Sequence, residues 1–240
     1  MHRLGKSGRR LVSESFWQLA TMKQIAKKCV RYLLPMTRRL ALAPRVLLEE
    51  MPDHPDLFDQ YRLMLASGMK RVRGGWEFEG RIYPDYLTVG GTSRAIERTA
   101  LKYCTGNGLD IGAGYWPLHG STPIDLMRGP GLGQSLGDIP AASQDFVFSA
   151  HTLEHIAEWK QELNTWIGKL KAGGHLFLYL PHPDCGLWHP RNPYMAQEHK
   201  WVPDAAIVSD YLATVSLSVV GRDDGPDHFY SFFVCARKIA

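Results

Sequence analysis

The chain has 240 residues, of which 45% are hydrophobic and 22% charged, and its formal net charge is +4. Length and composition suit one globular domain with an extension, and no run of about 18 apolar residues is present, which excludes an integral membrane protein. The four cysteines form no C-x-x-C pair, so we expect reduced thiols and a cytoplasmic protein.

The first 50 residues form a basic segment. They carry eleven Lys or Arg and three acidic residues, a net charge of +8, whereas the remaining chain carries −4. Apolar residues recur at loosely helical spacing, and Pro35 and Pro44 divide the stretch into short amphipathic helices. Two interpretations stay open: a helical lid with a solvated face, or a peripheral anchor on the anionic inner face of a membrane. We expect no nucleic-acid partner.

Residues 51–90 contain several prolines and two aromatic clusters, and we predict a connector packed on the main domain, 91–240. A helix is predicted to follow Gly91, because apolar residues between 96 and 104 recur at i, i+4, i+7 and i+8.

Beyond this helix, short apolar runs alternate with helical segments. We predict strands near 108–112, 122–126, 145–149, 174–180, 214–221 and 228–237. One amphipathic helix runs from Trp159 to Leu170 and is predicted to stop at Gly173 and Gly174. This alternation predicts a mostly parallel α/β sheet covered on both faces. The last two strands should be antiparallel, because six residues cannot form a crossover helix.

Residues 106–114 form a short apolar strand that turns at Gly112 and Gly114. In parallel sheets a ligand binds at the carboxyl ends of the strands, and glycines there let the backbone approach it closely. Pro117 occupies the third glycine position of the dinucleotide fingerprint, which argues against a pyrophosphate. Asp125 closes the second strand, where a carboxylate can hold ribose hydroxyls. We therefore expect a ligand with a ribose and no phosphate.

Five segments follow one another in a characteristic order. They are Gly-Leu-Asp-Ile-Gly-Ala-Gly (108–114), Asp125, Gly-Asp-Ile-Pro (137–140), Gln-Asp-Phe-Val-Phe-Ser-Ala-His-Thr-Leu-Glu-His (144–155) and Leu-Lys-Ala-Gly-Gly-His-Leu-Phe-Leu-Tyr-Leu-Pro (170–181). Together they resemble the class I S-adenosylmethionine-dependent methyltransferases often called type 11, from about Tyr83 to the C-terminus. Only ten residues separate Gly114 from Asp125, too few for the long first helix of that family, so a shortened subgroup is predicted.

The resemblance implies a Rossmann-like, mostly parallel seven-stranded sheet with an antiparallel last strand, and S-adenosyl-L-methionine as cofactor. The cofactor-binding residues that it implies are Asp110, Gly112, Ala113, Gly114, Asp125, Asp138, Ile139 and Ser149. The turn 112–114 would approach the methionine part of the cofactor, supported by Asp110. Asp125 would hold the ribose, and residues 138–139 would border the adenine. Ser149 would line the route from cofactor to substrate.

His151 and His182 follow the predicted strands 145–149 and 174–180, at the expected mouth of the site. Methyl transfer from a sulfonium depends mostly on alignment, but a hydroxyl acceptor also needs a proton acceptor, and histidine is the usual one. We predict that role for these two residues, with ordinary loop histidines as the alternative. Two interpretations stay open for residues 181–201: a substrate wall, whose aromatic and amide side chains would suit a sugar, or a covering loop. The predicted substrate is therefore a small molecule, or a surface glycan or lipid-linked sugar that is methylated on oxygen.

Residues 151–155 also match H-x-x-E-H, in which two histidines on one helix bind zinc and the glutamate acts as base. A zinc hydrolase built on His151, Glu154 and His155 is thus an alternative. His151 directly follows a strand, however, so we predict no metal. A further alternative is a non-catalytic membrane-surface protein that retains the fold.

Overall fold

The computed structural model describes residues 64–66, 68–73, 75–83, 91–114, 116–124, 135–192 and 198–239. The chain divides into two compact units at Asp53, and all of these residues lie in the second. The predicted basic extension, 1–50, lies outside the described residues, and the division into 1–50, 51–90 and 91–240 stays a prediction. Within the described ranges, no helix has the length and apolar character needed to cross a membrane.

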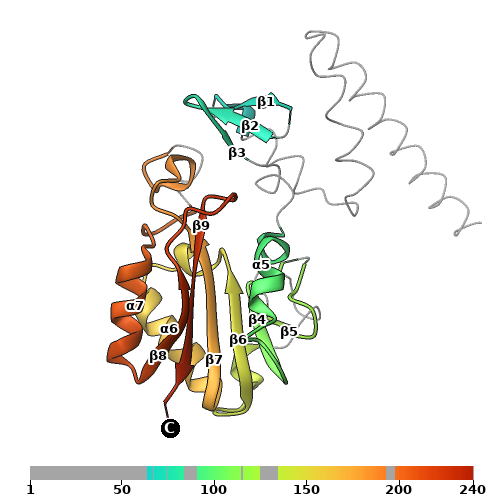
Figure 1. Ribbon diagram of the computed structural model, residues 1–240, viewed down its shortest axis with the longest axis vertical. Helices are drawn as coiled ribbons and strands as arrows, with labels where there is room; N and C mark the ends of the chain where they lie inside the picture. Colours follow the sequence, from blue (N-terminus) through green and yellow to red (C-terminus); the bar gives the residue numbers. More distant parts are fainter. Residues whose placement is uncertain are drawn as a thin grey trace, which may run out of the picture. The chain divides into compact units, whose positions relative to one another are not determined.

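A six-stranded sheet forms the centre of the fold, in the order β5-β4-β6-β7-β9-β8 (Figure 1). Its strands are β4 (Gly108–Ile111), β5 (Thr122–Ile124), β6 (Gln144–Ala150), β7 (Leu170–Pro181), β8 (Leu217–Asp223) and β9 (Ser231–Lys238). The first four are parallel, whereas β9 is antiparallel to β7 and to β8. The predicted mostly parallel sheet with an antiparallel last strand is confirmed. In the described part of the chain, it has six strands instead of seven.

Helices cover both faces of this sheet. α6 (Trp159–Lys169) and α7 (Ala205–Thr214) lie on one face and α5 (Thr92–Ala100) on the other (Figure 1). Side chains alternate along β7: Leu176 and Leu178 belong to the core shared with α6 and α7, while Phe177 and Tyr179 belong to the core shared with α5. Burial on both faces explains why these strands are continuous apolar runs in the sequence.

The end of α6 differs from the prediction. The helix ends at Lys169, and Leu170 is already extended, so the predicted stop at the glycine pair is wrong. Gly173 and Gly174 lie inside β7 instead, where β6 and β7 shift register. A Cβ on Gly174 would lie 3.0 to 3.1 Å from three backbone carbonyl oxygens, two of them in β6. Gly174 therefore allows β6 and β7 to approach closely.

Residues 70–83 form a second, three-stranded antiparallel sheet that the sequence analysis did not predict. It consists of β1 (Lys70–Val72), β2 (Gly75–Phe78) and β3 (Arg81–Tyr83). Trp76 and Tyr83 are buried against Leu187 and Trp188, which follow β7. Arg81 donates a hydrogen bond to the carbonyl of Asp184 at 2.9 Å. This small sheet thus packs on the segment that leaves the carboxyl end of β7.

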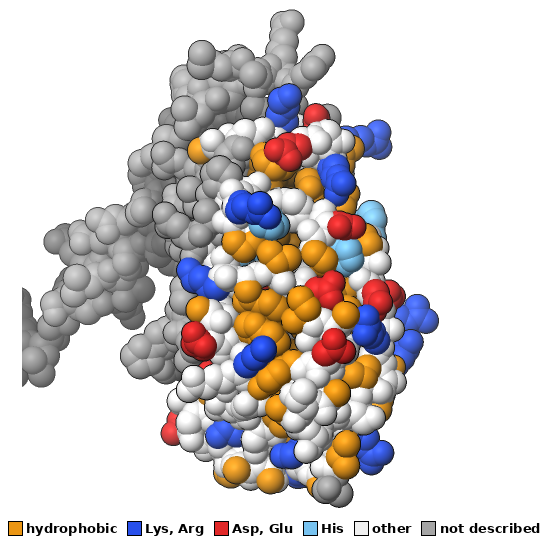
Figure 2. Space-filling model, turned by 90° about the vertical axis from the view of Figure 1, so that its left-hand side faces the viewer, with side chains coloured by type: hydrophobic (Ala, Val, Ile, Leu, Met, Phe, Trp, Pro, Cys, Tyr) orange, Lys and Arg blue, Asp and Glu red, His pale blue; other side chains and the backbone are white. Residues whose placement is uncertain are grey.

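One face of the molecule, next to α7, carries both apolar and charged side chains. Figure 2 shows apolar side chains interrupted by charged ones, with histidine side chains reaching the surface in its upper part.

The close approach of β4 and β6 can be tested at Gly108. A Cβ there would lie 2.4 Å from the ring of Phe146, which is buried. We expect Gly108→Ala to lower the free energy of unfolding by about 1 to 3 kcal/mol, because the core has no room for the methyl group. Urea unfolding followed by tryptophan fluorescence measures this.

Gly168→Ala is the matched control. Gly168 lies in α6, and a Cβ there would meet no described atom within 4 Å. This variant should gain about 0.5 to 1 kcal/mol, since alanine favours a helix over glycine. A Gly108→Ala variant as stable as the unmodified chain would contradict the packing of β4 on β6.

Candidate functional site

The turn after β4 begins the candidate site. Gly112 and Gly114 have φ angles of +78° and +52°, which favour glycine. The backbone N–H of Gly112 donates to the carbonyl of Ile124, at the end of β5, at 2.8 Å. Beneath the turn, the buried carboxylate of Asp110 accepts the N–H of Leu118 at 2.7 Å. Asp110 therefore fixes the path of the connection, which is the support that the resemblance implies.

The turns after β4 and β6 meet at Gly112. A Cβ on Gly112 would lie 1.9 Å from Oγ1 of Thr152, so a side chain of this protein already fills that space. Gly114 differs, because a Cβ there would meet no atom of the described residues within 4 Å. Gly112 thus serves the packing of the two turns, and Gly114 is the glycine with room beside it.

The connection from β4 to β5 contains turns and no helix in its described part. One turn joins the N–H of Trp116 to the carbonyl of Ala113, and a second joins Ser121 to Leu118. The hydroxyl of Ser93 donates to the carbonyl of Trp116, which attaches the connection to the start of α5. Asp125 follows β5 and lies outside the described residues, so its ribose role stays a prediction.

Ser149 lies at the same carboxyl edge. It is fully buried, and its hydroxyl donates to the carbonyl of Ile111 at 2.8 Å, which joins the ends of β6 and β4. Ala113 is also buried. The structure therefore brings Asp110, the turn 112–114 and Ser149 together at one end of the sheet. Their contact with a cofactor stays a prediction.

Asp138 and Ile139 lie elsewhere. Asp138 is exposed at the end of η1 (Leu136–Asp138), a single 3₁₀ turn. The carbonyl of Ile139 accepts a hydrogen bond from Lys169 Nζ at 2.7 Å, and Ser143 N–H donates to the carbonyl of Lys169. Since Lys169 directly precedes β7, this stretch lies beside the amino ends of β6 and β7. It is not brought together with Gly112.

A group of histidines surrounds a buried carboxyl after β6. Glu154 lies in η2 (Leu153–His155), and its side chain is 0% exposed. Its Oε1 is 3.6 Å from Nδ1 of His151 and 3.9 Å from Nε2 of both His155 and His199. Burial raises the pKa of Glu154 to about 8. Burial, followed by the neighbouring histidines, lowers the pKa of His151 well below its ordinary value and that of His199 to about 4.

The H-x-x-E-H pattern does not form the helix that a zinc hydrolase requires. Only Leu153–His155 is helical, as one 3₁₀ turn, and His151 precedes it with a φ of +51°. His151 and His155 approach the glutamate between them rather than a common point beyond it. The zinc-hydrolase alternative is not favoured.

His151 and His182 each have a nitrogen engaged within the protein. Nε2 of His151 is 2.9 Å from the hydroxyl oxygen of Ser231, and its ring centroid is 4.7 Å from that of Trp188. Nδ1 of His182 accepts the N–H of Asp184 at 3.1 Å, so the neutral ring of His182 carries its hydrogen on Nε2. Their catalytic role stays a prediction.

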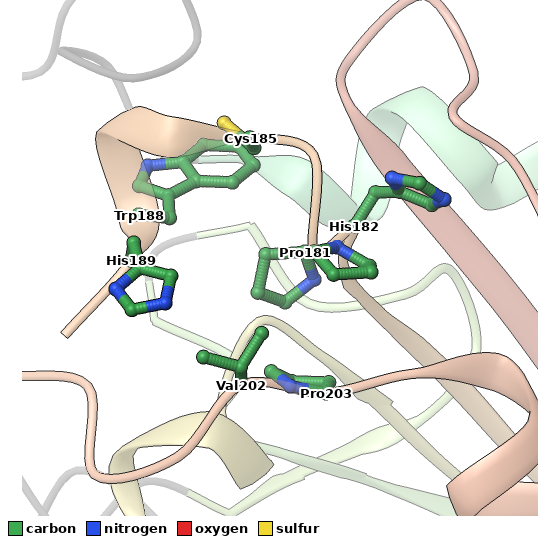
Figure 3. A pocket seen from close by; sticks show the side chains of 8 residues that line it. Pro181, His182, Cys185, Trp188, His189, Val202 and Pro203 are labelled. Carbon is green, nitrogen blue, oxygen red and sulfur yellow. The ribbon is translucent and has the colours of Figure 1, made fainter.

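A small pocket lies beyond the end of β7 (Figure 3). It is lined by Pro181, His182, Pro183, Cys185, Trp188, His189, Val202 and Pro203. Trp188 and His189 stand on one side of it, Pro181 and His182 on another, and Val202 and Pro203 face them from below (Figure 3). Its volume is about 10 Å³, which is room for about one water molecule.

No family model and no curated protein matches the sequence. Several solved structures resemble the fold. The 1,6-didemethyltoxoflavin-N1-methyltransferase of Burkholderia thailandensis is 16% identical over 65% of this chain and 82% of its own, with a TM-score of 0.48. The N-methyltransferase NodS of Bradyrhizobium japonicum is 19% identical over 65% and 91%, with a TM-score of 0.46. A methyltransferase of Mesorhizobium loti is 16% identical over 62% and 99%, with a TM-score of 0.45.

All three are named as methyltransferases, the class that the sequence motifs resemble. At such identities the likeness concerns the fold alone, so activity has to be argued from the residues of this chain.

Alanine substitutions can test whether Gly112 and Gly114 have different roles. Gly112→Ala and Gly114→Ala place a Cβ on similarly left-handed residues, but only the first meets Thr152. We expect Gly112→Ala to lose about 1 to 3 kcal/mol more stability than Gly114→Ala. Chemical unfolding of both variants measures the difference, and Thr152→Gly should restore part of it in Gly112→Ala. Equal losses for the two glycines would contradict the contact.

Proposed function

We propose that this protein is an S-adenosyl-L-methionine-dependent methyltransferase. The observation that carries the proposal is the agreement of motif and geometry at residues 112–114. The ordered motifs resemble this class, and the glycine turn lies at the carboxyl edge of parallel strands, where such sheets bind their ligands. Asp110 supports the turn through Leu118, and Gly114 has space beside it. These features fit a cofactor that approaches the backbone closely.

In this proposal the cofactor binds along the ends of β4 and β5, with the ribose held by Asp125. The carbonyl of Ile139 accepts a hydrogen bond from Lys169 beside the amino ends of the strands. The adenine role predicted for Asp138 and Ile139 would therefore require that stretch to reach the carboxyl ends of the strands.

The bound cofactor supplies a methyl group that its sulfonium already activates. The protein has to hold the acceptor in line with that group and exclude water, and alignment of this kind is worth up to about 7 to 11 kcal/mol. A hydroxyl acceptor also loses a proton. His151 is the candidate to accept it: burial lowers its pKa well below the ordinary value, which keeps the ring neutral but also makes it a weaker base than an ordinary histidine. Its Nε2 would have to exchange the contact with Ser231 for one with the acceptor.

We propose a small-molecule acceptor, methylated on oxygen. A hydroxyl of a surface glycan or lipid-linked sugar fits the aromatic and polar side chains after β7, where Trp188, His189 and His182 line the small pocket. The pocket would have to open to admit a sugar ring, because it has room for about one water molecule. The three-stranded sheet packs on the same segment and would cover the bound acceptor.

Calorimetry with S-adenosyl-L-methionine tests the proposal. We expect the full chain to bind the cofactor and Gly114→Leu to bind it at least about tenfold more weakly, because the leucine side chain fills the space beside the turn. Gly120→Leu is the control, since Gly120 is also left-handed with no described atom within 4 Å of a Cβ. Absence of binding by the unmodified chain at high micromolar concentration would favour a non-catalytic protein. If Gly114→Leu binds the cofactor as tightly as the unmodified chain, the turn 112–114 is not part of the cofactor site.

We further propose that residues 1–50 bring the protein to the inner, cytoplasmic face of a membrane, which their net charge of +8 supports. Deleting them should weaken binding to liposomes that contain anionic lipid, most strongly at low salt, because surface attraction is screened. Sedimentation with anionic and with neutral liposomes measures this. Unchanged binding to anionic liposomes would favour the helical-lid interpretation.

A further inference from the structure

Glu154 carries a buried acid group that the proposed methyl transfer does not explain. Its side chain is 0% exposed. Apart from the backbone N–H of Glu154 itself, neither carboxyl oxygen has a hydrogen-bond partner among the described residues. Burying an acid without partners is costly, so a native fold normally supplies something for it to bind.

Two imidazoles are oriented toward this group. His155 belongs to the same 3₁₀ turn, and His199 comes from the segment before α7. Nδ1 of His199 is 2.6 Å from the carbonyl of Trp188, and Nδ1 of His155 is 3.3 Å from the carbonyl of Glu198. A carbonyl can only accept, so each Nδ1 carries the hydrogen, and Nε2 of each neutral ring presents a lone pair. Both Nε2 atoms lie 3.9 Å from Oε1 of Glu154.

Lone pairs on two nitrogens and one oxygen repel one another unless a metal ion or a proton lies among them. The separation of 3.9 Å is too long for a direct hydrogen bond. It is close to the spacing of about 3.4 Å between ligands that share one tetrahedral zinc ion at about 2.1 Å. All three ligand atoms lie within 4.8 Å of one another, so a small inward movement completes the geometry.

We propose that Glu154, His155 and His199 bind a divalent transition-metal ion, for which Zn²⁺ is the simplest fit. Two imidazoles with a carboxylate form a ligand set that zinc accepts, with a fourth position for water or a further group. Nδ1 of His151 lies 3.6 Å from Oε1 of Glu154. The carbonyls of Trp188 and Glu198 orient the two ligating rings, as partners of metal-bound histidines commonly do.

The site differs from the H-x-x-E-H hydrolase pattern. His199, distant in sequence, takes the place of His151, and the glutamate is a ligand rather than a base. The ion would join the turn after β6 to the segment that carries His199. The two are also joined by a backbone hydrogen bond, because the N–H of Lys200, next to His199, donates to the carbonyl of Glu154 at 2.8 Å. The metal would therefore stabilise the wall of the pocket after β7, and the proposal does not depend on methyl transfer.

The test uses the full chain, freed of metal with a chelator and dialysed. We expect it to bind one equivalent of Zn²⁺ by elemental analysis, to develop the visible bands of tetrahedral Co²⁺ on cobalt titration, and to melt at a higher temperature with Zn²⁺. His155→Ala and His199→Ala should each lose at least tenfold in affinity. His228→Ala is the control, because His228 is exposed and its ring meets that of Phe229 edge-on.

Glu154→Gln keeps the shape of the side chain but removes its charge. It therefore distinguishes a Glu154 that binds a metal ion from a Glu154 that is only a buried acid. It should abolish tetrahedral cobalt binding, yet melt no lower than the metal-free chain, since a neutral amide is easier to bury than a carboxylate. Two results would overturn the proposal: no uptake of Zn²⁺ or Co²⁺ by the folded chain, or unchanged affinity in His155→Ala and His199→Ala. Glu154 would then hold a proton instead of a metal ion. Neither result bears on cofactor binding, which is measured separately.

Discussion

The contact between Gly112 and Thr152 organises the carboxyl edge of the sheet. A Cβ on Gly112 would lie 1.9 Å from Oγ1 of Thr152, so only glycine lets the turn after β4 lie against the turn after β6. Thr152 sits between His151 and the 3₁₀ turn that carries Glu154. The glycine turn and the histidine group are therefore neighbouring parts of one packed edge. In the sequence they suggest competing functions, whereas in the fold they depend on the same contact.

The sheet could be predicted because burial leaves a strong pattern in the sequence. β6 and β7 are buried on both faces and read as apolar runs, and the short connection before β9 allows only an antiparallel pair. The glycine pair after α6 was misleading, since a left-handed Gly173 suits a helix end as well as a strand irregularity. Which of the two forms depends on the pairing of β7 with β6, which is not visible in the local sequence. The small sheet was missed because its strands have three or four residues and its core lies on Trp188, far away in sequence.

The candidate site could be predicted only where its residues follow one another in a motif. Asp110 and Gly114 were found this way, and the structure gives each a physical setting. The motif did not reveal that Gly112 makes room for Thr152, because that contact joins two turns about 40 residues apart. Nor did the motif show that Ile139 lies beside the amino ends of the strands. The order of residues along the chain does not determine at which end of the strands a connecting segment lies. His199 has no spacing signal at all with respect to Glu154.

The reversal of the last strand explains one more feature that no local motif contains. Because β9 is antiparallel to β7, its first residue, Ser231, pairs with Pro181, the last residue of β7. The start of β9 therefore lies at the edge where the parallel strands end, and there Ser231 contacts Nε2 of His151. Just before it, Asp227 accepts a hydrogen bond from the hydroxyl of Tyr179, and burial, followed by this contact, raises the pKa of that phenol. The side-chain contact of His151 is therefore made by a strand that begins 80 residues further along the chain, so the orientation of this histidine depends on how the sheet is assembled.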